Sequence, residues 1–257
     1  MAKYNKLSKM VANAKKNCVA QDFLDELNYC IELENKSTYI PSKSFKPSGI
    51  SGCKRALYYE LKGVQPDEDQ KTTELTGICE SGTDRHESIQ SYVMRMQENG
   101  LNCEWLDVGE YVRKNNIDAE VVSQNGNETK LFSKKYNMRF LCDGLIRYKG
   151  ELYILEIKTE ASNKFMQHDR PWPDHIQQAT CYSMVLEVPK VIFLYENRDI
   201  CSKKAFLVEV TDLMIKRVEG IINDVNRFVS NNELPPKENK CKYCKYRTQC
   251  ARDGERD

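Results

Sequence analysis

Residues 139–159 contain the pattern that most restricts the fold of this chain. Two segments rich in apolar residues, 139–148 and 151–159, are separated only by Lys149-Gly150. A two-residue connection that ends in glycine, between two such segments, is a strong signal for a β-hairpin. We therefore expect a hairpin whose register follows from counting outward from the pair that flanks the turn.

That register places Asp143 directly opposite Glu156, with Cβ atoms ~4.5–5.5 Å apart. Side chains alternate between faces along a strand, so Glu156 and Lys158 share one face. Two carboxylates this close repel each other unless a cation lies between them. Mg²⁺ or Mn²⁺ takes such oxygens and leaves coordination positions for a phosphate oxygen. The alternative is a surface hairpin with an ordinary Glu–Lys pair, because a D…ExK pattern alone is common.

The remaining periodicity predicts an α/β chain. Helices are expected over 1–35, 54–62, 173–186 and 212–229, and a longer one from a cap at Ser81 or Thr83 to Glu98. Further strands are expected over 108–112, 119–123, 130–132, 190–195 and 205–210, with a turn at Asn125-Gly126. We expect an N-terminal helical region over 1–45 and one compact domain over 46–257.

Composition restricts the class of protein further. The 257 residues are 40% hydrophobic and 30% charged, with no apolar run of the ~20 residues that span a bilayer. The N-terminus lacks the apolar segment of a secretory signal, so we expect a soluble, cytoplasmic protein without a membrane partner. A net charge of +1 excludes a global basic field, so contacts with nucleic acid must come from local basic clusters.

Two patterns on the flanking helices also carry polar side chains. His86 lies in the segment GTDRHE near the start of the long helix, where a lone histidine is more often a surface or capping residue. Gln178 and Tyr182 have the i,i+4 spacing that places two side chains on one helix face. In isolation, this second pattern fits a helix with a half-buried tyrosine.

The eleven cysteines form a further constraint. Their odd number and scattered spacing argue against a disulfide scaffold and for a reducing compartment. Cys241, Cys244 and Cys250 form CxxCxxxxxC in a polar tail, where a metal site is the best reason for order. Three thiolates are one short of a closed site, and Cys53 is the candidate fourth. We expect the following cysteines simply to be buried: Cys79, Cys103, Cys142, Cys181 and Cys201.

The hairpin resembles motifs II and III of the PD-(D/E)XK nuclease superfamily, with Cys142 in place of the proline. The His86 segment and the Gln178–Tyr182 pair resemble the RecB-like branch, in the same order along the chain. This resemblance implies a restriction-endonuclease-like fold, a mixed central sheet flanked by helices. It also implies Lys158 as a catalytic residue, Gln178 and Tyr182 as supporting residues, and a Mg²⁺ or Mn²⁺ centre held by His86, Asp143, Glu156 and the Ile157 carbonyl.

The cysteines resemble those of the iron–sulfur nucleases of this branch, which include CRISPR-associated exonucleases and AddB nuclease domains. In those proteins one cysteine before the nuclease core joins three after it on a [4Fe–4S] cluster. The resemblance covers residues 46–252 and implies a cluster on Cys53, Cys241, Cys244 and Cys250 that joins the tail to the segment before the core. Four thiolates also suit zinc, and the sequence leaves both metals open.

The function implied is a metal-dependent deoxyribonuclease, an exonuclease acting on single-stranded ends in phage or prokaryotic recombination, repair or CRISPR adaptation. Two alternatives stay open: a DNA-binding or processing subunit of a larger complex, and a zinc-stabilised interaction protein with a decayed nuclease core. Basic and aromatic residues near the cysteines suit single-stranded DNA, but solvated charges explain them equally well. They are Lys54, Arg55, Lys240, Lys242, Tyr243, Lys245, Tyr246 and Arg247.

Overall fold

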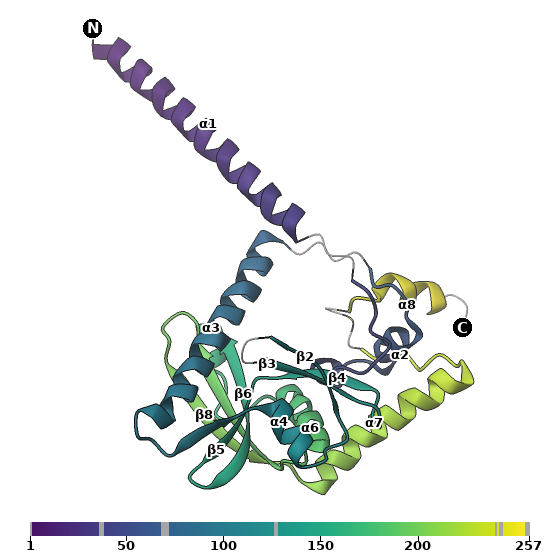
Figure 1. Ribbon diagram of the computed structural model, residues 1–257. Helices are drawn as coiled ribbons and strands as arrows, with labels where there is room; N and C mark the ends of the chain where they lie inside the picture. Colours follow the sequence, from purple (N-terminus) through teal and green to yellow (C-terminus); the bar gives the residue numbers. More distant parts are fainter. Residues whose placement is uncertain are drawn as a thin grey trace. The chain divides into compact units, whose positions relative to one another are not determined.

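The computed structural model describes residues 2–35, 39–67, 72–125, 128–239, 241 and 244–254. The chain divides into two compact units, Met1–Tyr39 with Asp69–Ser81 and Ile40–Glu68 with Gly82–Asp257. The first unit contains helix α1 (Ala2–Glu34), as predicted, and the beginning of helix α3 (Thr73–Glu98) (Figure 1). All of the described strands belong to the second unit. None of the described helices has the length and apolar character needed to cross a membrane.

A five-stranded mixed sheet forms the centre of the second unit, in the order β1-β5-β6-β7-β8. Its strands are β1 (Cys103–Leu106), β5 (Gly144–Tyr148), β6 (Glu151–Glu160), β7 (Lys190–Asn197) and β8 (Lys203–Glu209). β6 and β7 are parallel and the other pairs are antiparallel. Parallel neighbours need a crossover, which α5 (Ser162–Phe165) and α6 (Pro173–Leu186) supply. The predicted mixed sheet flanked by helices is confirmed.

Strand β6 is buried on both faces because helices cover it from both sides. Leu155 and Ile157 pack against Ile89 of α3. On the other face, Ile154 belongs to the main core together with Ala179 of α6. The strand that carries the predicted catalytic pair therefore lies in the middle of the unit.

The predicted hairpin register is confirmed. Lys149 (φ 51°) and Gly150 (φ 85°) both have positive φ, as a type I′ turn requires. The ladder runs without interruption from Tyr148↔Glu151 to Gly144↔Leu155.

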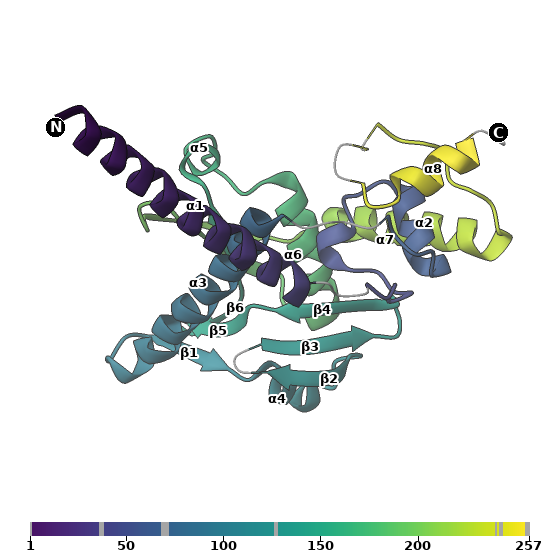
Figure 2. The same cartoon turned by 90° about the horizontal axis from the view of Figure 1, so that it is seen from above.

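The predicted single strand over 139–148 is wrong, because it is divided at Asp143. Strand β4 (Met138–Cys142) ends before this residue and β5 begins after it. β4 pairs with β3 (Glu128–Ser133), which pairs with β2 (Glu120–Asn125) in a second, antiparallel sheet of three strands (Figure 2). The chain thus passes from one sheet to the other at Asp143.

Other predicted elements differ in ways that local chemistry explains. Residues 108–112 form part of helix α4 (Val108–Lys114) and not a strand, because the Asp107 carboxylate caps the helix by accepting from Glu110 N at 2.6 Å. α3 begins at Thr73, earlier than the predicted caps at Ser81 or Thr83. Strand β1 was not predicted, and the turn at Asn125-Gly126 lies partly outside the described residues.

Among its described residues, the second unit contains four further helical segments. They are α2 (Lys54–Lys62), α7 (Asp212–Asn231), α8 (Arg247–Gly254) and the single 3-10 turn η1 (Pro47–Gly49). α2 and α7 match the prediction and contact each other, whereas α8 was not predicted. The tail docks on α2 through Glu60, whose side chain is only 9% exposed. One Glu60 oxygen accepts from Tyr246 Oη (2.8 Å) and Lys245 Nζ (2.7 Å), and the other accepts from Ser42 N (3.1 Å).

We expect Tyr246→Phe to lower the free energy of unfolding by about 1.5 kcal/mol or more, the value of a hydrogen bond to a charged group. Tyr246 is fully buried against Tyr59, with ring centroids 5.4 Å apart, so the substitution leaves the packing intact and removes only the hydroxyl. Urea unfolding followed by tryptophan fluorescence measures the change. Tyr92→Phe, at an exposed position of α3, is the control and leaves the midpoint unchanged.

Candidate active site

Asp143 lies at the junction of the two sheets and is held through both its side chain and its backbone. Its Oδ2 accepts a hydrogen bond from Ile157 N at 2.8 Å. Its carbonyl oxygen accepts from Gln90 Nε2 at 2.7 Å, and Gln90 is fully buried on α3. The next residue must be glycine, because a Cβ at Gly144 would lie 2.5 Å from the Trp105 ring. The predicted pair of Asp143 with Glu156 lies one step beyond Gly144↔Leu155, the last pair of the β5/β6 ladder.

Glu156 is 1% exposed, and neither of its carboxylate oxygens accepts a well-formed hydrogen bond from the described residues. Lys158 Nζ lies 2.6 Å from Glu156 Oε1 as an ion pair. Burial, and then the Asp143 carboxylate, raise the pKa of Glu156 to about 8. Burial acts to lower the pKa of Lys158, but Glu156 and Asp143 outweigh it, so the net shift is upward. The site therefore concentrates negative charge that a single lysine only partly offsets.

The predicted supporting residues join this site through a chain of hydrogen bonds. Lys158 Nζ donates to Gln178 Oε1 at 3.2 Å, and Gln178 Nε2 donates to Tyr182 Oη at 2.6 Å. Tyr182 is 4% exposed and packs against Phe140, with centroids 5.1 Å apart. The i,i+4 pair on α6 thus fixes the lysine at the end of β6.

Helix α3 brings His86 to the site from the opposite face of the sheet. His86 Nδ1 lies 3.8 Å from Asp143 Oδ2. Burial lowers the pKa of His86, Asp143 acts to raise it and Lys158 acts to lower it, which leaves the neutral imidazole that binds metals. The neighbouring Arg85 anchors the helix through two hydrogen bonds, from Nε (2.7 Å) and Nη2 (3.0 Å), to the fully buried carboxylate of Glu196 on β7.

Glu128, at the start of β3, also reaches the site and was missed by the sequence analysis. One ligand atom each of His86, Glu128 and Asp143 lie within 4.8 Å of one another. The strand was predicted only over 130–132. Extending it by two residues and pairing it with the segment before Asp143 would have found this carboxylate. This group of one imidazole and two carboxylates fits a divalent cation, whereas the predicted ligand Glu156 does not belong to the group and is paired with Lys158.

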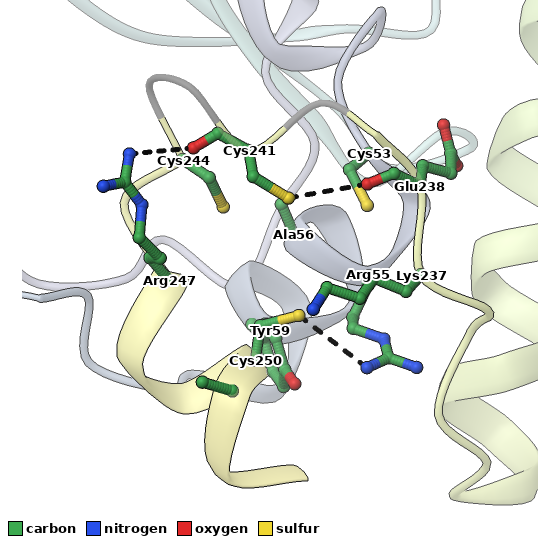
Figure 3. Close-up of a pocket in the computed structure, with 11 residues that line it drawn as sticks. Cys53, Arg55, Ala56, Tyr59, Lys237, Glu238, Cys241, Cys244, Arg247 and Cys250 are labelled. Carbon is green, nitrogen blue, oxygen red and sulfur yellow. Dashed lines mark hydrogen bonds between the residues drawn. The ribbon is translucent and has the colours of Figure 1, made fainter. Parts of the chain in front are cut away.

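The four predicted cysteine ligands line one cavity of about 120 Å³ (Figure 3). Cys53 precedes α2, Cys241 and Cys244 lie in the tail, and Cys250 lies on α8. Burial raises the pKa of the Cys244 thiol, and the other three cysteines act on it in the same direction. No disulfide joins the cysteines in the described part of the chain. Four thiols from segments almost two hundred residues apart, converging on one cavity, fit a metal centre.

The five cysteines predicted to be buried fall into two groups. Cys103, Cys142 and Cys181 are buried as predicted, whereas the predicted burial of Cys79 and Cys201 is wrong. Cys201 lies at positive φ (57°) in the turn that joins β7 to β8, and Cys79 lies on an exposed position of α3.

The predicted basic and aromatic residues near the cysteines have mixed environments. Tyr246 is buried and bonded to Glu60, so it is not available for base stacking. Lys240, Lys242 and Tyr243 lie outside the described residues.

No family model and no curated protein matches this sequence. Among solved structures, the chain is similar to the crystal structure of SSO0001, with 17% identity over 86% of this chain and 93% of that chain (TM-score 0.45). It is also similar to an alkaline exonuclease, LHK-Exo of Laribacter hongkongensis, with 11% identity over 84% of this chain and 95% of that chain (TM-score 0.44). For LHK-Exo in complex with dAMP, the identity is 12% over 75% of this chain and 90% of that chain (TM-score 0.44). Likeness at this level assigns neither a family nor an activity to the chain.

We expect Arg85→Lys to lower the free energy of unfolding by about 1 kcal/mol, because lysine keeps the charge but cannot make both hydrogen bonds to Glu196. Urea unfolding measures this change. Arg95→Lys, at an exposed position of the same helix, is the matched control. Equal stability of the two variants would show that the paired hydrogen bonds do not stabilise the helix that carries His86.

Proposed function

We propose that this protein is a Mg²⁺- or Mn²⁺-dependent deoxyribonuclease of the PD-(D/E)XK type, an exonuclease that hydrolyses phosphodiester bonds at single-stranded DNA ends. The observation that carries the proposal is Glu156, a buried carboxylate whose ion pair with Lys158 Nζ (2.6 Å) does not outweigh its burial and the nearby Asp143 carboxylate, so that its pKa is raised to about 8. Two carboxylates that share one lysine fit a site where a divalent cation supplies the remaining positive charge.

The roles of the residues follow from their positions. His86, Asp143, Glu156 and the Ile157 carbonyl would hold the divalent cation, which when bound polarises a phosphate oxygen and lowers the pKa of a coordinated water. Asp143 is oriented for this by the Ile157 N–H, and burial lowers the pKa of His86, which favours the metal-binding imidazole form. Gln178 and Tyr182 keep Lys158 at the same face, where its ammonium would offset charge on the transition state or orient the attacking water.

DNA as the substrate is supported by the resemblance of the motifs and by basic side chains at the cysteine cavity. Lys237 and Arg247 line this cavity and are exposed, although Arg247 Nη2 also donates to Cys241 O at 2.9 Å, and we propose that they contact a phosphate backbone. Arg55 has a different role, because its Nε donates to Pro235 O at 2.7 Å and its Nη1 lies 3.7 Å from Cys250 Sγ.

Hydrolysis of end-labelled single-stranded DNA with Mg²⁺ or Mn²⁺ tests the proposal. We expect Asp143→Ala and Glu156→Ala to reduce the rate to background, and Lys158→Met to reduce it by about 10²-fold or more, as for loss of one transition-state contact. Glu209→Ala removes an exposed carboxylate of β8 and keeps the parent rate. Digestion by Asp143→Ala at the parent rate would contradict the assignment.

We further propose that Cys53, Cys241, Cys244 and Cys250 hold a [4Fe–4S] cluster, with zinc as the alternative metal. The shared cavity supports a metal held by the four thiolates, and the resemblance favours iron. Such a centre would tie the tail to the residues that begin α2.

Protein purified without oxygen is expected to show broad visible absorption together with stoichiometric iron and sulfide. We expect Cys53→Ser to lose most of the iron, because three thiolates and a hydroxyl hold the cluster poorly. Cys201→Ser, at an exposed cysteine away from the cavity, keeps the iron content of the parent. Stoichiometric zinc in a colourless protein would show that the metal is zinc and not iron. An unchanged metal content of Cys53→Ser would show that Cys53 is not a ligand.

A further inference from the structure

We infer that Glu128, on the three-stranded sheet, is a direct ligand of the divalent cation at His86 and Asp143. The inference rests on the proposed function, because it concerns the same cation. It adds a residue that the sequence motifs do not include, and it places that residue on a different sheet from Glu156.

The registers of the two sheets bring Glu128 to this position. The β3/β4 ladder ends at Thr129↔Cys142, so the next step places Glu128 opposite Asp143. The β5/β6 ladder ends at Gly144↔Leu155, so the next step there places Asp143 opposite Glu156. Side chains directly opposite each other have Cβ atoms ~4.5–5.5 Å apart. Asp143 therefore has one carboxylate on each side, one from each sheet.

The separations fit one ion. Nitrogen and oxygen ligands lie about 2.0–2.2 Å from a Mg²⁺ or Mn²⁺ centre, so two ligands of one ion are at most about 4.4 Å apart. The ligand atoms of His86, Glu128 and Asp143 are all within 4.8 Å of one another. A movement of a few tenths of an ångström in half-buried side chains brings them to bonding distance.

The charges at the site also favour a cation there. Burial raises the pKa of Glu128, and the Asp143 and Glu87 carboxylates raise it further. The buried oxygens of Glu156 accept no well-formed hydrogen bond from the described residues and have Lys158 Nζ, 2.6 Å away, as their ion-pair partner. A divalent cation between Glu128 and Asp143 would neutralise the repulsion between these two carboxylates. Because Glu128 belongs to the small sheet, this cation would join that sheet to the central one.

Calorimetric titration of the full-length protein with MnCl₂, without DNA, tests the ligand directly. We expect Glu128→Gln to weaken Mn²⁺ binding by at least about tenfold, since even residues behind the ligands cost that much when lost. Glu87→Gln is the matched control, because it removes the same charge from an exposed position next to His86. We expect the affinity of this control to stay within about threefold of the parent, a small effect typical of an exposed charge.

Further variants separate the possible outcomes. If Glu128→Gln binds Mn²⁺ as tightly as Glu87→Gln, Glu128 is not a ligand. If Asp143→Asn also keeps the parent affinity for Mn²⁺, the proposed cation site itself is wrong. If Asp143→Asn loses Mn²⁺ binding while Glu128→Gln keeps it, only the role of Glu128 is overturned. Circular dichroism checks folding. If Glu128→Gln does not fold, Glu128→Asp decides, because it keeps the charge but withdraws the carboxylate by one methylene: weaker binding supports the inference and parent-like binding overturns it.

Discussion

The hydrogen bond from the Ile157 amide to the Asp143 carboxylate fixes the point where the chain passes from the small sheet to the central sheet. A bond between an amide and an ionised carboxylate is stronger than one between neutral groups, and this one acts together with the Gln90 side chain on the Asp143 carbonyl. Asp143 is thereby held without a partner in either ladder. His86 Nδ1 on α3 lies 3.8 Å from this carboxylate, and the same carboxylate acts to raise the pKa of Glu156 on β6.

Three buried carboxylates of the central sheet show why only one of them indicates function. Burial acts to raise the pKa of Glu160 and Glu196, but hydrogen bonds from side chains that include His168 and Arg85 outweigh it, and the pKa of each is lowered. These two are stable structural ions. Glu156 is equally buried, has no such hydrogen bonds and has a raised pKa. Its ion pair with Lys158 does not outweigh burial and the nearby Asp143 carboxylate, and a carboxyl group with a pKa shifted in this way is typical of functional sites.

Much of the candidate site was predictable because it depends on short-range geometry. The turn at Lys149-Gly150 determines the register that leads to Asp143, and the i,i+4 spacing determines the contact of Gln178 with Tyr182. Glu128 was not predictable in the same way, because its place depends on the pairing of β3 with β4 in a separate sheet. The pairing of Arg85 with Glu196 joins residues 111 positions apart, and no local pattern reveals such a contact.

The tail has two kinds of attachment, hydrogen bonds to α2 and the cavity lined by four cysteines, and both involve helix α8. Hydrogen bonds hold helix α8 and the residue before it, since Tyr59 Oη donates to Asp253 at 2.8 Å and Tyr246 Oη donates to Glu60 at 2.8 Å. Cys241 and Cys244 lie before these anchors and face Cys53 across the cavity (Figure 3). A metal centre there would tie Cys241 and Cys244 to Cys53 and, through Cys250, add to the contacts that α8 already makes with α2.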